Sequence, residues 1–259
     1  EIQVVADGPP RNTSVIIYDN GEGQHPEDFE STFLSLLRGN KINIHFVQGK
    51  YNMGGSGALV FCGKKRYQLI GSKRFDNKSN FGFTLVRQHK IAESAETKRF
   101  SHFRYLKIDG KIPSFDSEEM DLKLYDRNFK TGTIIKLYAY QFPPGYVGFA
   151  QDLNQSLNEF LFEPVLPILM VDKKERYPNN KVLELDLFGL KRRLEEDKNV
   201  YVDSFFSEEY EDLLFGKAKV TCYVFKPKLE GRDVKKTKGI IRDRFFRNNM
   251  SVMFSVNGQ

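Results

Sequence analysis

The sequence contains no tryptophan and only two cysteines, Cys62 and Cys222, which stand apart in hydrophobic strings. Without spaced cysteine pairs, neither a disulfide scaffold nor a thiolate zinc site is expected, and a reducing, cytoplasmic setting fits best. The longest apolar stretch, residues 165–171, is broken by Pro167 and is far shorter than the roughly 20 residues of a transmembrane helix. These absences exclude disulfide-stabilised secreted domains, zinc fingers and helical membrane proteins.

Several catalytic patterns are missing as well. The four histidines, His25, His45, His89 and His102, lack the spacing of metal ligands, so no residue is assigned to a metal. There is no Gly-x-Ser-x-Gly nucleophile elbow, and no glycine loop closes with the Gly-Lys-Ser or Gly-Lys-Thr of a P-loop. Enzymes of these two classes are therefore disfavoured.

The sequence does contain enough apolar material for a folded core, since 40% of its 259 residues are hydrophobic and 14% are aromatic. A chain of this length predicts one large or two medium domains. Its net charge of +6 permits binding to a polyanion without requiring it. The chain starts at Glu1 and has no signal-like segment, so we expect a piece of a longer polypeptide.

Periodicity and turn residues organise the first part of the chain. Residues 15–18 are apolar and end in Asp-Asn-Gly-Glu-Gly, which predicts a strand entering a tight turn. A helix is predicted over residues 26–39, because Pro26 suits a first turn and apolar residues then recur at helical spacing. A glycine-rich loop at 54–57 should lead into a short helix at 58–61.

The remaining segments predict an α+β fold. Strand-like stretches with polar connections indicate a mostly antiparallel layer, at residues 67–70, 83–86, 103–108 and 134–140. The Pro-Pro-Gly run near residue 144 marks a domain boundary, which divides 1–142 from 143–259. The second domain should begin with a helix at 153–161 and a buried strand at 165–171. Further on, a strand at 220–225, a basic helix at 240–247 and a strand at 252–256 suggest a crossover unit.

Three short segments carry residues suited to nucleotide chemistry. Asp19, at the end of a buried strand, can accept a hydrogen bond from an exocyclic amine, while the adjacent glycines let a flat ring approach the backbone. Residues 49–57 supply unhindered amides and a helix start for phosphates, and Thr133 after Gly132 adds a hydroxyl. Each segment also has an ordinary explanation: a hairpin turn, a surface loop and a strand threonine.

In this order, the three segments resemble those of the GHKL ATPase superfamily, which comprises gyrase B subunits, heat-shock chaperones of the ninety-kilodalton class, histidine kinases and MutL. Residues 19–23 are similar to its DxGxG purine motif, residues 53–59 to its glycine-rich lid hinge, and Gly132-Thr133 to its end-of-domain threonine. The resemblance implies a Bergerat-type ATP-binding α/β sandwich, in which the aspartate binds the adenine amine and the lid wraps the phosphates. It nominates as ATP-binding residues Asp19, Gly21, Gly23, Gly54, Gly55, Ser56, Gly57, Ala58 and Thr133.

The last residues, 253–259, are similar to the Val-Asn-Gly-Arg strand of the α/β transducer domain that follows the ATPase module in MutL and gyrase. This resemblance points to the MutL, gyrase and Morc branch of the superfamily. In those relatives a transducer lysine reaches the γ-phosphate. The resemblance thus implies a catalytic role for one of Lys235, Lys236 and Lys238, and the sequence does not choose among them.

One family feature is missing from the sequence. The first GHKL motif is a helix whose glutamate activates water and whose asparagine holds Mg²⁺, placed just ahead of the DxGxG strand. Residues 1–14 contain Pro9-Pro10 and no such helix, so it lies upstream in a longer protein or is absent. If it is absent, the chain should hold a nucleotide without hydrolysing it by the family's route. Glu22 and Glu30 are nearby, but solvated turn and helix-face roles explain them.

The resemblance implies ATP binding and slow Mg²⁺-dependent hydrolysis that drive lid closure, domain rotation or homodimerisation, with a DNA link in repair or phage defence. No membrane partner is expected. The alternative is a non-hydrolysing nucleic-acid-binding scaffold that uses the basic segment after residue 231. A solvated helix face with one catalytic lysine explains the same segment.

Overall fold

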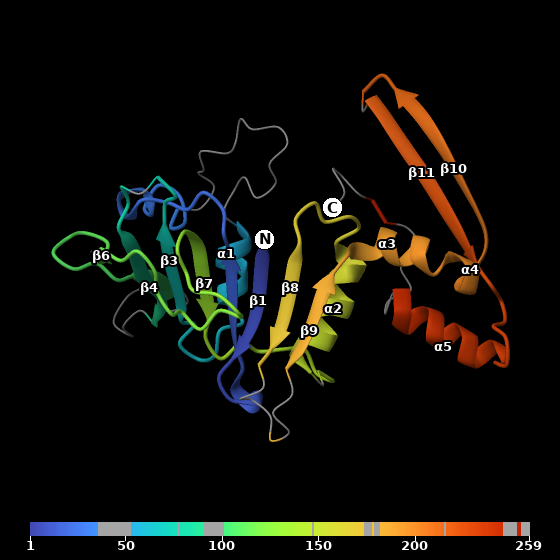
Figure 1. Cartoon of the computed structure of the whole chain (residues 1–259), viewed down its shortest axis with the longest axis horizontal. Helices are drawn as coiled ribbons and strands as arrows, with labels where there is room; N and C mark the ends of the chain where they lie inside the picture. The colour runs from blue at the N-terminus through green and yellow to red at the C-terminus, as the bar shows by residue number, and fades with distance from the viewer. Residues whose placement is uncertain are drawn as a thin grey trace. The chain divides into compact units, whose positions relative to one another are not determined.

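The computed structural model describes residues 1–35, 53–76, 78–90, 101–146, 148–173, 178, 182–214, 216–245 and 253–254. The chain divides into two compact units, which are described separately (Figure 1). The first unit comprises Glu1–Asp152 and Leu166–Asp186, and the second comprises Leu153–Val165 and Leu187–Gln259. None of the described helices is both long and apolar enough to cross a membrane.

The first unit is built on one large mixed sheet, in which the strands follow the order β5-β4-β3-β7-β2-β1-β8-β9, with β6 paired to β4 (Figure 1). Among the described registers, only the β1–β8 pair is parallel. The strands are β1 (Ile2–Asp7), β2 (Ser14–Asp19), β3 (Gln68–Lys73), β4 (Phe81–Lys90), β5 (Ser101–Tyr105), β6 (Ser114–Phe115), β7 (Gly132–Leu137), β8 (Ile168–Asp172) and β9 (Leu183–Leu187).

The expected α+β class and the mostly antiparallel layer are confirmed, as are the strands that correspond to β2, β3, β4, β5, β7 and β8. Three strands of the first unit were not expected: β1, β6 and β9. Because β8 pairs with β1, residues 166–186 join the first compact unit. The division between the compact units therefore does not follow the expected boundary after residue 142.

The helical segments of the first unit are short. They are η1 (Pro10–Asn12), η2 (Pro26–Asp28) and α1 (Met53–Leu59), while α2 (Phe149–Phe160) begins in the first unit and continues into the second. The helix expected at 153–161 thus starts earlier. The helix expected at 58–61 is also displaced, because α1 already includes the glycines that were assigned to a loop.

The helix predicted over residues 26–39 is wrong in its described part, and residues 36–39 lie outside the described residues. A 3₁₀ turn forms, with Asp28 N–H bonded to His25 O at 3.0 Å and Phe29 N–H to Pro26 O at 3.3 Å, and hydrogen-bonded turns rather than an α-helix follow it up to residue 35. Tertiary packing decides this segment: Phe29 is fully buried, and Pro26 lies so close to Gly82 that a Cβ there would come within 2.8 Å of it. Packing against the sheet overrides the helical pattern.

The two faces of the sheet are covered differently. On one face, side chains from several strands pack with Leu124 and Phe129 of the long segment before β7 into a buried cluster that includes Val5, Ile16, Tyr18, Phe81, Ile134 and Val171. Strand residues alternate between faces, so Ile17 and Asp19 of β2 project from the opposite face. That second face carries the candidate site.

The second unit combines a two-stranded hairpin with helices. Tyr223 and Phe225 of the hairpin pack on a small core formed by Leu190, Leu194, Ile241 and Phe245. Its elements are α3 (Gly189–Glu196), α4 (Lys198–Tyr201), β10 (Val202–Asp212), β11 (Gly216–Phe225) and α5 (Val234–Phe245).

Two expectations for this unit need correction. The predicted strand at 220–225 lies in β11, but it pairs with β10 as a hairpin and forms no described crossover unit. The basic helix begins at Val234 rather than at residue 240. Three of the five residues of the predicted strand at 252–256 lie outside the described residues, and the other two, Met253 and Phe254, show no regular structure.

We predict that Gly132→Ala destabilises the protein strongly. Gly132 has a φ of +103°, and a Cβ there would lie 1.9 Å from the carbonyl oxygen of Asp19. Gly110→Ala is the matched control, because Gly110 has a φ of +74° and nothing within 4 Å. The control should cost about 1–2 kcal/mol for its positive φ alone. Urea unfolding should show a larger loss for Gly132→Ala, and equal losses would contradict the close approach.

Candidate functional site

The candidate site is a row of polar side chains across three neighbouring strands. Asp19 at the end of β2 lies opposite Thr133 on β7, and Thr133 lies opposite Ser72 on β3. Residues directly opposite each other on paired strands project from the same face. One carboxylate and two hydroxyl groups therefore line one end of the sheet, with Ser72 and Thr133 buried and Asp19 half-buried.

Ser72 connects β3 to β7 and to the segment after β2 through its hydroxyl group. Its hydroxyl donates a hydrogen bond to Gly132 O at 2.8 Å, accepts one from Gln24 N–H at 2.9 Å and lies 3.2 Å from the Thr133 hydroxyl. A serine hydroxyl has one hydrogen to donate. Because that hydrogen goes to Gly132 O, Thr133 donates to Ser72, and the Thr133 oxygen keeps its acceptor capacity toward the site.

The turn after β2 is held against the end of β3. The Asp19 carboxylate accepts a hydrogen bond from Gly21 N–H at 2.9 Å, and Phe75 N–H donates to Glu22 O at 3.0 Å. Gly23 has a φ of +68°, and a Cβ there would lie 2.1 Å from the carbonyl oxygen of Lys73. The strand ends at Asp19 as expected, but a bend at Gly21 takes the place of the tight turn, and only glycine fits at position 23.

An apolar strip borders the polar row. Ile17 on β2 and Ile135 on β7 are register partners one step along the same face, and both are only half-buried. Their neighbours in the same row, Val4 and Ile70, are buried. The face thus offers accessible aliphatic surface beside a carboxylate, which suits a flat heterocycle that carries an amine.

The predicted lid residues Gly54, Gly55, Ser56, Gly57 and Ala58 all lie in α1, and the first four are exposed. A Cβ at any of the three glycines would meet nothing within 4 Å. The end of α1 is attached where β7 finishes, because Gln141 N–H bonds to Phe61 O and Cys62 forms a bridge with Tyr140. That attachment is at the opposite end of β7 from Thr133, so the described contacts do not bring these residues to the polar row.

The three predicted lysines lie on the first turns of α5, in the second unit. All three are exposed, and the Lys236 ammonium lies 3.6 Å from Asp233. Further along α5, Arg242 pairs with Asp243, and Arg244 pairs with Asp197. Carboxylates therefore already neutralise part of the basic segment.

The carboxylates near the site are occupied by cations. Glu22 pairs with Arg74. Glu30 pairs with Lys107 at 2.7 Å and accepts a hydrogen bond from Tyr105, and these two bonds lower the pKa of Glu30 below its ordinary value. A carboxylate with a lowered pKa is a weak general base. Within the described residues, no three His, Cys, Asp or Glu side chains gather as metal ligands.

Comparison with protein-family models and with curated proteins finds no match for this sequence. The interpretation of the site therefore depends on its geometry. That geometry brings together four of the nominated residues, Asp19, Gly21, Gly23 and Thr133.

The sequence prediction missed Ser72. A serine near the end of a strand is common, and no motif distinguishes it. Its role follows only from the β3–β7 register, which pairs residues far apart in the chain. The one available signal is a small hydroxyl residue two positions after the strand predicted at 67–70.

We predict that Ser72→Ala lowers stability by about 1–3 kcal/mol, because Gln24 N–H and Gly132 O lose a buried partner. Ser114→Ala, at an exposed serine on β6, is the matched control and should change the free energy of unfolding little. Chemical denaturation of both variants tests this. Equal stabilities would mean that Ser72 does not hold the row together.

Proposed function

We propose that this chain binds ATP through a Bergerat-type sandwich, with adenine placed against the row formed by Asp19, Thr133 and Ser72. The observation that carries the proposal is the row itself: a half-buried carboxylate in register with two buried hydroxyls, beside accessible aliphatic surface. Adenine presents an amine donor on its edge and apolar ring faces. Asp19 supplies the acceptor, and Ile17 with Ile135 supplies the apolar surface.

The simpler explanation, an ordinary hairpin turn after Asp19, does not account for this arrangement. In a β-hairpin, the strand after the turn pairs with the strand before it. Here β2 pairs with β1 and β7, and the chain after the turn crosses to the end of β3, where Gln24 bonds to Ser72. The segment that contains Gly21 and Gly23 thus leads from β2, which pairs with β7, to the end of β3 at the polar row.

ATP also carries a triphosphate, which needs protein groups of its own. We propose that α1 forms a lid over the phosphates and that Mg²⁺ accompanies the nucleotide. Slow hydrolysis would drive lid closure, domain rotation or homodimerisation of a transducer-linked protein in the cytoplasm. When bound, Mg²⁺ would neutralise phosphate charge, using substrate oxygens and few protein ligands. Neither Glu22 nor Glu30 is assigned as the general base, because both are engaged by cations.

The test of adenine recognition is Asp19→Ala. Removing a charged acceptor should weaken ATP binding by roughly 1.5–3 kcal/mol, measured by isothermal titration calorimetry. The matched control is Asp116→Ala, at an exposed aspartate in the same unit, which should leave the affinity unchanged. Unchanged ATP affinity in Asp19→Ala would refute the assignment.

A second variant separates recognition from folding. Asp19→Asn keeps an oxygen for Gly21 N–H and can turn a donor toward the ligand. Guanine carries a carbonyl where adenine carries the amine. We therefore expect Asp19→Asn to lose ATP affinity while its ratio of GTP to ATP affinity rises. A proportional loss for both nucleotides would assign Asp19 a structural role only.

A further inference from the structure

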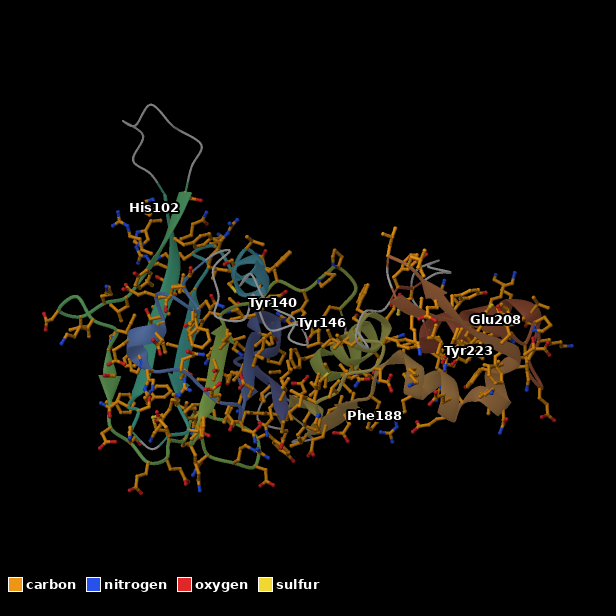
Figure 2. The ribbon with its side chains drawn as sticks, turned by 90° about the horizontal axis from the view of Figure 1, so that it is seen from above. His102, Tyr140, Tyr146, Phe188, Glu208 and Tyr223 are labelled. Atoms are coloured by element: carbon orange, nitrogen blue, oxygen red, sulfur yellow. The ribbon has the colours of Figure 1, made fainter. Side chains whose placement is uncertain are left out.

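A cluster of arginines and histidines lies on the β4–β5 hairpin. Arg87 lies opposite Arg104, and His89 lies opposite His102, so all four side chains project from one face. The two imidazole rings are stacked, with centroids 5.8 Å apart and planes 6° apart. Figure 2 shows His102 near the end of this hairpin, among side chains that end in nitrogen.

Among the residues that the structure describes, the arginines are hydrogen-bonded to histidines and not to carboxylates. Arg87 Nε donates to His89 Nε2 at 3.0 Å, and Arg104 Nε donates to His102 Nε2 at 2.8 Å. Within the described part of the chain, neither guanidinium forms an ion pair. Each histidine orients its arginine through Nε alone. Arg87 Nη1 donates one hydrogen bond to the Tyr67 hydroxyl at 3.4 Å, and the other terminal N–H groups of the two guanidinium forks can reach an acceptor.

This arrangement carries an electrostatic cost. Like charges directly opposite each other on paired strands destabilise a sheet. Here the field also acts on His89, whose pKa is lowered by desolvation and by the charges of Arg87, Arg104 and His102. An anion over the pair converts this repulsion into attraction, and a guanidinium fork matches the oxygens of a phosphate.

A basic turn lies next to β4. Gln88 of β4 bonds through its N–H to Lys65 O at 3.2 Å, which fixes the basic turn of Lys64, Lys65 and Arg66 beside the same strand. The two lysines are exposed. A single phosphate would engage only part of this set, whereas a chain of regularly spaced phosphates can engage several members at once.

We propose that the β4–β5 hairpin binds the phosphate backbone of nucleic acid through Arg87 and Arg104, oriented by His89 and His102. The proposal does not depend on ATP binding. It also differs from an interaction through the segment after residue 231, where carboxylates compete for Lys236, Arg242 and Arg244.

The experiment measures binding of a fluorescent mixed-sequence DNA oligonucleotide, single-stranded and duplex, by anisotropy as salt is raised without nucleotide. Replacing both arginines by glutamine (Arg87→Gln, Arg104→Gln) should weaken binding. The slope of log affinity against log salt should fall by about 1.4 for the single strand and about 1.8 for the duplex. A wild-type chain that binds neither form at low salt, or an unchanged slope, overturns the proposal.

Two controls locate the effect. Lys217→Gln with Lys219→Gln removes the same charge from β11, where each lysine faces a glutamate, and should leave binding nearly unchanged. Lys235→Gln with Lys238→Gln tests the basic segment, and a loss confined to that variant would overturn the proposal. Arg87→Lys with Arg104→Lys keeps the charge and should preserve the salt slope. If it loses binding as fully as the glutamine variant does, the arginines act structurally and the proposal fails.

Discussion

The position of β7 between β2 and β3 is the constraint on which the candidate site depends. Its two registers place Thr133 opposite both Asp19 and Ser72. A slip of one residue in either pairing would turn a member of the row to the other face of the sheet. The close contact of Gly132 with the Asp19 carbonyl and the bond from Ser72 to Gly132 fix these registers where β7 begins.

The same alternation of side chains separates the two proposed binding surfaces. Gly82 of β4 lies opposite Ser72 and shares the face of the polar row, so the odd-numbered residues of β4 lie on the other face. Arg87 and His89 are among them, beyond Phe81 and Phe83, which pack with the buried cluster. A nucleotide at Asp19 and a phosphate backbone at Arg87 would therefore contact opposite faces of one sheet.

Strands with local β-branched and apolar patterns could be predicted from the sequence. The end of the strand at Asp19 could be predicted too, because Asp, Asn and Gly at residues 19–23 favour a change of chain direction. The sequence did not allow prediction of what depends on distant pairing. The positions of Ser72 and of the Arg87–Arg104 pair in their sites follow only from the strand registers. In the same way, β8 pairs with β1 although the two strands lie far apart in the sequence. The helix prediction after Pro26 was wrong for the same reason, because the burial of Phe29 outweighed the helical spacing of the apolar residues.

The glycines of α1 are not explained by the helix that contains them. Glycine inside a helix costs roughly 1 kcal/mol relative to alanine, and a Cβ at Gly54, Gly55 or Gly57 would meet nothing. Packing therefore does not require glycine there, in contrast to Gly23 and Gly132, where backbone lies within 2.1 Å of the Cβ position. A segment that changes conformation, or whose backbone must approach a ligand, does require it. The proposed lid gives these three residues the role that the helix itself does not.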